Sequence, residues 1–125
     1  MQRPFEFTGR IRSFKYAFAG LWVMLKTQHN AWIHFAATII TIALAVVYQL
    51  TTAEWCFIIL AIVSVWMAEA LNTAFEFLAD VTTPEFHPLV KKSKDVAAGA
   101  VLLAAIGAVA IGLIVFGPKV FSQLF

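Results

Sequence analysis

Residues 69–95 read EALNTAFEFLADVTTPEFHPLVKKSKD, and the rest of the chain is organised around this stretch. It holds 5 of the 7 acidic residues and 3 of the 9 Lys and Arg residues, although it begins inside an apolar run. Five of its polar residues have a spacing that places them on one face of a helix: Glu69, Asn72, Thr73, Glu76 and Asp80. Ionisable groups in a membrane-length segment cost roughly 2.5–3.5 kcal/mol each to insert, and they usually mark a functional site inside a helical bundle.

The composition indicates a single all-α membrane domain over residues 1–125. The chain is 62% hydrophobic and 13% charged, whereas soluble domains are about 25% charged. Twelve Phe and four Trp residues suit lipid and its interfaces. The net charge of only +2 argues against a nucleic-acid partner.

The N-terminal part predicts an amphipathic surface helix over residues 10–28, after a loosely ordered tail at 1–9. Its apolar residues share one side, and a stripe of cations lies beside them, as in a helix that lies in the membrane interface. The alternative is that the apolar side packs on the bundle of the same chain, and the two arrangements are compatible.

Three membrane-spanning helices follow, because roughly 20 residues at about 1.5 Å each cross a hydrocarbon core of ~30 Å. We place them at 31–50, 55–81 and 95–116. A tight turn at 51–54 joins the first two, and two prolines predict a cytoplasmic loop at 82–94. Gly117 and Pro118 are expected to end the third span.

The basic residues predict the orientation of the spans. Eight of the nine Lys and Arg residues precede the first span or lie between the second and the third. The positive-inside rule therefore places the N-terminus and the 82–94 loop in the cytoplasm. If the second span enters from outside at Trp55, Glu69 lies about 21 Å deep and Glu76 about 31 Å deep, at the cytoplasmic interface.

The polar residues permit phosphoryl transfer without proving it. There is no GxxxxGK[ST] phosphate loop, no GxSxG elbow and no histidine spacing typical of zinc. Carboxylate and amide oxygens are ligands for Mg²⁺, lysines hold phosphates, and a carboxylate at low dielectric can act as a base. From the residues alone, proton or cation translocation through the carboxylates ranks as high as phosphoryl transfer.

A resemblance to a known family favours phosphoryl transfer. The chain runs Glu69-Ala-Leu-Asn72-Thr73-Ala-Phe-Glu76, then Asp80, then His87-Pro88, then Lys94-Asp95-Val-Ala-Ala-Gly99. This pattern resembles the signature of the small prokaryotic diacylglycerol kinase family, which includes undecaprenol kinases. The resemblance covers roughly residues 10–118. The stretch HPLVKKSKDVAAGAVLL is more similar to the undecaprenol kinase branch.

The resemblance implies a homotrimer in the bacterial inner membrane that transfers the γ-phosphate of ATP to a lipid hydroxyl. Active sites would lie at the cytoplasmic interface and be shared between subunits. Carried over by position, Glu69 would be the general base, Asn72 would hold the reacting phosphate or the lipid headgroup, and Glu76 would bind Mg²⁺. The residues near the nucleotide would be Asp80, Lys94, Asp95 and Gly20.

One position departs from the family pattern. The family usually has a glutamate after the surface helix as a second Mg²⁺ ligand, and this chain has Gln28 there. Glutamine keeps a carbonyl oxygen but loses the charge, so metal affinity should fall at this position.

Two other functions stay open at this level. One is a small proton-coupled transporter that uses Glu69, and the other is a non-catalytic membrane subunit of the same fold. The sequence also does not distinguish undecaprenol from diacylglycerol, because both present a hydroxyl at the interface and an apolar tail in the bilayer.

Overall fold

The protein folds into four helices and no strands within residues 4–125, which the computed structural model describes. They are α1 (Phe7–Thr27), α2 (His29–Val47), α3 (Thr52–Thr82) and α4 (Pro88–Leu124). The last three are long and apolar enough to cross a membrane. The prediction of an all-α membrane protein with three candidate spans is therefore confirmed. Residues 1–3 of the expected tail lie outside the described part of the chain.

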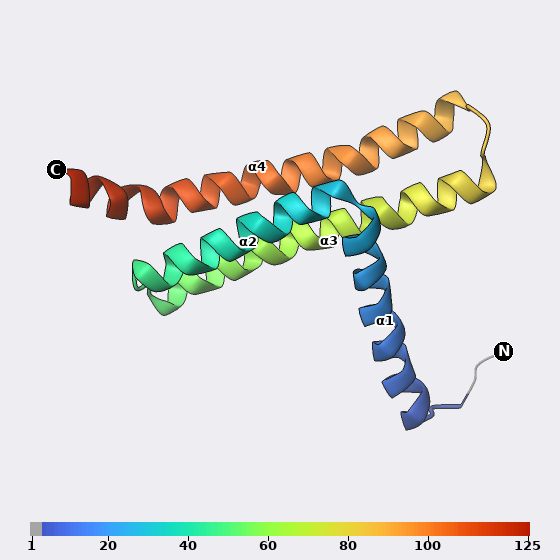
Figure 1. The fold of residues 1–125 in the computed structure, drawn as a ribbon, viewed down its shortest axis with the longest axis horizontal. Coiled ribbons are helices and arrows are strands. Elements are labelled where there is room, and N and C mark those ends of the chain that lie inside the picture. Colours follow the sequence, from blue (N-terminus) through green and yellow to red (C-terminus); the bar gives the residue numbers. More distant parts are fainter. Residues whose placement is uncertain (1–3) are drawn as a thin grey trace.

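Helices α2, α3 and α4 run side by side, and α1 turns away from them (Figure 1). Along α1 only Met24, near the end that meets the bundle, is buried. The apolar residues Ile11, Phe14 and Phe18 are all exposed. The apolar side of α1 therefore does not pack on its own bundle and remains free for another apolar environment, as expected for a helix on a membrane surface.

Helix α4 packs along α3 through small residues. Ala104, Ala108 and Gly112 recur every fourth position and are half-buried, whereas Ala100 of the same series is exposed. Small side chains allow two helices to approach closely where lipid leaves no hydrophobic force between them. Beyond α3, no helix makes extensive contact with α4 in the described residues.

An apolar core fixes the end of the bundle that lies far from α1. It consists of Ala45 from α2, Leu50 from the turn after α2, Ile58 from α3 and Val115 from α4. The same end carries an ion pair between Lys119 and Glu54 at 3.0 Å. This end is thus closed by packing, and the polar residues of α3 lie toward the opposite end.

Helix α4 begins at Pro88, so the prediction of a loop over 82–94 is wrong for residues 88–94. Proline is tolerated at the first position of a helix, because the N–H that it lacks would have no partner there. His87 completes the start as the N-cap, where its Nδ1 accepts from the backbone N–H of Leu89 at 3.2 Å. The connection between α3 and α4 shrinks to residues 83–87.

Helix α4 also continues through Pro118 to Leu124, so the stop predicted at Gly117-Pro118 is wrong. Proline removes one intrahelical hydrogen bond, but leaving the helix inside a bilayer would remove many. The last turns are tied back to the bundle, because the Tyr48 hydroxyl donates to Oε1 of Gln123 at 3.2 Å.

Two smaller boundaries also differ from the prediction. The turn expected at 51–54 lies at 48–51, where Gln49 has a positive φ of 51° and the Thr51 hydroxyl caps α3 by accepting from the N–H of Glu54. Helix α1 begins at Phe7, inside the expected tail, because the N–H of Arg10 already finds the carbonyl of Glu6.

Candidate active site

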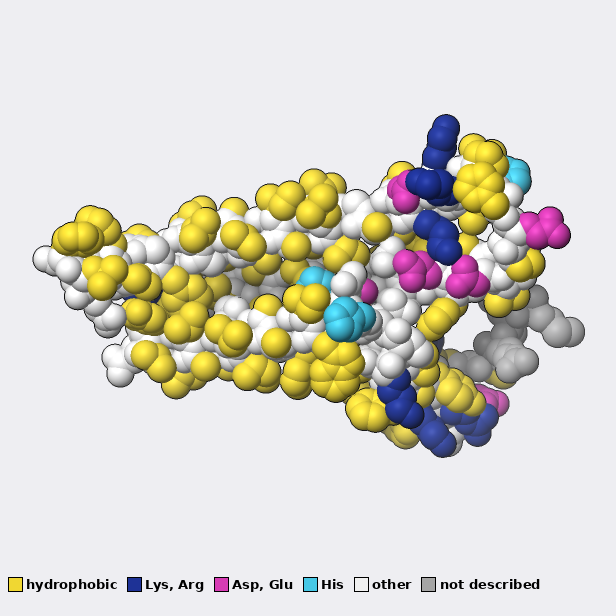
Figure 2. All heavy atoms as spheres, turned by 45° about the horizontal axis from the view of Figure 1, so that its top comes forward, with side chains coloured by type: hydrophobic (Ala, Val, Ile, Leu, Met, Phe, Trp, Pro, Cys, Tyr) yellow, Lys and Arg dark blue, Asp and Glu magenta, His cyan; other side chains and the backbone are white. Residues whose placement is uncertain are grey.

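Charged side chains gather at one end of the molecule. Figure 2 shows most Lys, Arg, Asp and Glu side chains at the end with α1 and the α3–α4 connection, while hydrophobic side chains cover the rest of the visible face. The polar face of α3 leads from the interior of the bundle toward this end. A site on that face can therefore meet both an apolar and an aqueous molecule.

The polar residues of α3 share one face, as predicted, and their burial decreases along it. Glu69, Asn72 and Thr73 are buried, with 1%, 7% and 4% of their surface exposed. Glu76 is half-buried and Asp80 is exposed. At about 1.5 Å per residue, Glu69 and Asp80 are separated by ~16 Å along the helix axis. The face thus runs from an enclosed carboxylate to a solvent-accessible one.

Two buried groups on this face have no hydrogen-bond partner. They are Oε2 of Glu69 and Oδ1 of Asn72. The neighbouring Thr73 is satisfied, because its hydroxyl donates to the backbone carbonyl of Glu69 at 2.9 Å. Buried polar groups nearly always have partners, so each exception requires an explanation. A substrate group that these atoms would bind is one explanation.

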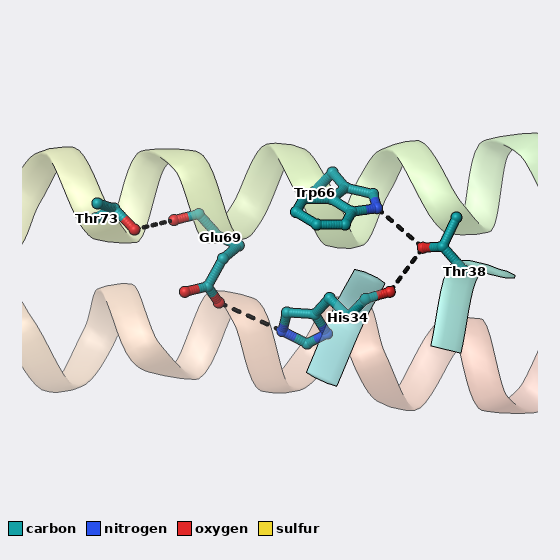
Figure 3. Close-up of polar contacts among 5 residues, drawn as sticks. All are labelled: His34, Thr38, Trp66, Glu69 and Thr73. Atoms are coloured by element: carbon teal, nitrogen blue, oxygen red, sulfur yellow. Dashed lines mark hydrogen bonds and ion pairs between the residues drawn. The ribbon is translucent and has the colours of Figure 1, made fainter. Parts of the chain in front are cut away.

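His34 of α2 faces Glu69 across the bundle, and the sequence analysis missed it. Its Nε2 lies 3.4 Å from Oε2 of Glu69 (Figure 3). The spacing of the three histidines argues against zinc and does not indicate another role for His34. The available signal was that His34 lies inside the predicted first span, residues 31–50, which contains no Lys, Arg, Asp or Glu.

Two grooves border this buried cluster. One, of about 310 Å³, lies between α2, α3 and α4 and is lined by Asn30, His34, Glu69 and Asn72 together with apolar residues of α4. The other, of about 510 Å³, is mostly apolar and runs between α3 and α4, with Asn72 in its wall and Lys92 at its rim. Asn72 therefore lies between a groove that contains several polar side chains and one that is almost entirely apolar.

Two exposed ion pairs lie at the polar end. Nζ of Lys94 is 2.9 Å from Oδ1 of Asp80, which joins α4 to α3, and Glu76 is also within electrostatic reach of Lys94. Asp95 instead pairs with Lys91 of its own helix at 2.7 Å. The structure thus brings together Lys94, Asp80 and Glu76, whereas Asp95 lies in a separate pair.

The remaining predicted site residues lie on and beside α1. Gln28 is half-buried between α1 and α2, and its side-chain amide donates to the Thr27 hydroxyl at 3.3 Å. Gly20 is exposed, with open space where a side chain would stand. Neither residue has a contact with Lys94 or Asp80 that would define a nucleotide site within one subunit.

The oxygen ligands at the polar end are too few to hold a metal ion by themselves. They suit an Mg²⁺ ion that is also bound by substrate phosphates. The described residues contain no group of three or more His, Cys, Asp or Glu side chains that could hold a metal. Mg²⁺ commonly binds one or two protein carboxylates plus substrate phosphates. The half-buried carboxylate of Glu76 and the carbonyl oxygen of Gln28 are suitable ligands of that kind.

Comparisons with known proteins identify relatives of this chain. Residues 15–116 match the family model described as prokaryotic diacylglycerol kinase. The chain is 39% identical over 108 residues to an undecaprenol kinase of Bacillus subtilis, covering 86% of this chain and 88% of that one.

Two further relatives carry the name diacylglycerol kinase. One, from Synechocystis, is 40% identical over 113 residues, covering 90% of this chain and 65% of the relative. The other, from Helicobacter pylori, is 32% identical over 109 residues, covering 82% and 85%.

Proposed function

The chain belongs to the prokaryotic diacylglycerol kinase family, and on this premise we propose that it phosphorylates a lipid alcohol with ATP. The acceptor is undecaprenol or a diacylglycerol, and the product is its monophosphate. The reaction takes place where the cytoplasmic face of the bacterial inner membrane meets the cytosol. Membership in this family identifies a membrane lipid kinase. We propose in addition that the phosphate donor is ATP and that the reaction takes place at the cytoplasmic face.

The observation that carries this proposal is the pair of unpartnered atoms on α3. Oε2 of Glu69 and Oδ1 of Asn72 are buried beside a groove and lack hydrogen bonds. A carboxylate and an amide in a bundle this apolar are costly unless they bind something. A lipid hydroxyl can enter from the side of the bilayer and donate a hydrogen bond to the Glu69 carboxylate, next to Oδ1 of Asn72.

The chemistry then follows from the order of residues along α3. Glu69 accepts the proton of the lipid hydroxyl while the lipid oxygen forms a bond to the γ-phosphorus of ATP. The bond from that phosphorus to the β–γ bridging oxygen breaks, and ADP leaves. Asn72 holds the reacting phosphate or the lipid headgroup beside Glu69. The carboxylate later releases its proton, so that one proton, ADP and a lipid phosphate are the products.

The polar end supplies the nucleotide site. Lys94 offers a positive charge to the phosphates, and Asp80 fixes that ammonium at 2.9 Å. Asp95 and Gly20 complete the site from α4 and α1. Bound Mg²⁺ would neutralise phosphate charge, with Glu76 and Gln28 as its protein ligands.

The distribution of basic residues and of exposed apolar surface supports the remaining parts of the proposal. Eight of nine Lys and Arg residues fall on the side of the N-terminus and of the α3–α4 connection, which supports a cytoplasmic location for that side. Large apolar side chains are exposed along all three spans. Lipid and two further copies in a homotrimer would cover them, and the active sites would be shared between subunits.

The test is direct phosphorylation by the purified protein. The full chain in detergent micelles receives γ-labelled ATP, Mg²⁺ and either undecaprenol or a diacylglycerol, and labelled lipid is counted after extraction. We expect label in at least one lipid. If neither lipid is labelled by the wild-type protein or by the Gln28→Glu variant, the kinase proposal fails.

Gln28→Glu is expected to strengthen Mg²⁺ binding. A second carboxylate adds negative charge to the ligand set, and the ligand charge count is a main determinant of affinity at such sites. We expect the Mg²⁺ concentration at half-maximal activity to fall by about 3- to 30-fold. The measurement is the rate of lipid phosphorylation against free Mg²⁺ at saturating ATP.

The control for this substitution is Gln123→Glu, which adds the same charge on α4 at the opposite end of the bundle. It should leave the Mg²⁺ dependence as it is. An unchanged Mg²⁺ requirement in Gln28→Glu would remove residue 28 from the metal site.

A further inference from the structure

The buried contact between α2 and α3 shown in Figure 3 involves a residue to which the catalytic proposal gives no role. Nε2 of His34 is buried and lies 3.4 Å from the buried Oε2 of Glu69. Neither atom has another hydrogen-bond partner. Each can therefore satisfy the other, across the interface of two helices that make few other contacts.

The position of His34 is fixed by its own surroundings. The Thr38 hydroxyl donates to the backbone carbonyl of His34 at 2.7 Å and accepts from Nε1 of Trp66 at 3.0 Å. The Trp66 ring also stands edge-on to the imidazole, with centroids 6.3 Å apart. These contacts tie α2 to α3 one turn from Glu69. The imidazole therefore has little freedom to leave the carboxylate.

The 3.4 Å separation is longer than a good N–H···O hydrogen bond, which is about 2.9 Å. Contacts around a catalytic base are often long without substrate and shorten when it binds. A neutral imidazole that carries its proton on Nε2 can donate to one carboxylate oxygen and leave the second oxygen for a substrate.

We propose that His34 is a positioning residue, which donates from Nε2 to Oε2 of Glu69 and so orients the carboxylate toward the groove shared with Asn72. The inference rests on the proposed function of Glu69 as the base. His34 does not touch the reacting phosphate in this scheme. It acts only through the geometry of Glu69, and a misplacement of about 1 Å at a reacting group can cost about 100-fold in rate.

The test compares two substitutions of similar size. His34→Gln keeps an N–H donor, and His34→Met removes it. With the full chain in micelles, we expect His34→Met to lower kcat about 10- to 100-fold, with the KM values for ATP and lipid within about threefold of wild type. His34→Gln should keep at least about a third of wild-type kcat. His29→Ala, an exposed histidine in the first turn of α2, is the control and should be near wild type.

A double substitution separates positioning from a structural role. Glu69→Asp withdraws the carboxylate by one methylene, so His34 can no longer reach it. Adding His34→Met to Glu69→Asp should lower kcat by less than about threefold, because the interaction is already lost. An effect as large as in the wild-type background, equal losses in the Gln and Met variants, or failure of both variants to fold would overturn the proposal. An inactive wild-type protein would instead count against the proposed function.

Discussion

Glu69→Gln is expected to lower kcat for lipid phosphorylation by about 10²- to 10⁴-fold, the range that a positioned general base contributes. Glutamine has nearly the same shape as glutamate, but its amide cannot take the proton of the lipid hydroxyl. The site is buried, with 1% of Glu69 exposed, so bulk water does not readily replace the lost base. The KM for ATP should change little, because the nucleotide residues lie closer to the polar end.

The measurement is the initial rate of labelled lipid formation at saturating ATP and lipid, corrected for folded protein. Glu54→Gln is the matched control, since Glu54 lies on the same helix at its opposite end and pairs with Lys119. That variant should retain wild-type kcat even where its thermal stability falls. A Glu69→Gln enzyme with more than about a tenth of wild-type kcat would show that another group accepts the proton.

Glu76→Gln is expected to cause the second large loss, about 10²- to 10³-fold in kcat at ordinary Mg²⁺ concentrations. Metal stabilisation of a transferring phosphoryl group is worth several kcal/mol, and about 1.4 kcal/mol corresponds to a factor of ten. Glu76 is the only carboxylate proposed for the metal, because position 28 is Gln. The variant has no charged ligand left there, and added Mg²⁺ should recover part of the rate.

A titration of activity against free Mg²⁺ checks this prediction. Glu85→Gln, which removes an exposed carboxylate from the α3–α4 connection, should follow the wild-type curve. If Glu76→Gln lowers the rate without altering the Mg²⁺ dependence, Glu76 is not the metal ligand and contributes in another way.

The general fold was accessible from sequence because lipid narrows the choices. Long segments without charge have to become spanning helices. The spacing of the polar residues from Glu69 to Asp80 places them on one face only if the segment is a helix. The same spacing predicted that these residues share one face, although only Glu69, Asn72 and Thr73 are buried on it.

Helix ends were harder to predict, because local signals compete there with the environment. Pro88 and Pro118 were both read as interruptions. Pro88 instead begins a helix, where a missing N–H has no cost. Pro118 lies inside one, because contacts such as that of Lys119 with Glu54 hold the last turns in place.

The site was predictable only along α3. Residues on one helix have a fixed spacing, so Glu69, Asn72 and Glu76 could be grouped from sequence alone. His34 comes from another helix, and nothing in the spacing of α2 indicates which α3 residue it will face. Such a pairing depends on how two helices are rotated and shifted against each other, which the structure supplies.

The most direct test of the central claim uses sealed membrane vesicles of both orientations. ATP does not cross a membrane unaided, so γ-labelled ATP added outside reaches only the face that points outward. We expect labelled lipid phosphate in inverted vesicles, whose cytoplasmic face is outside, and none in right-side-out vesicles until they are opened. Labelling in intact right-side-out vesicles alone, or in neither preparation after opening, would contradict a site that joins ATP to a lipid alcohol at the cytoplasmic face.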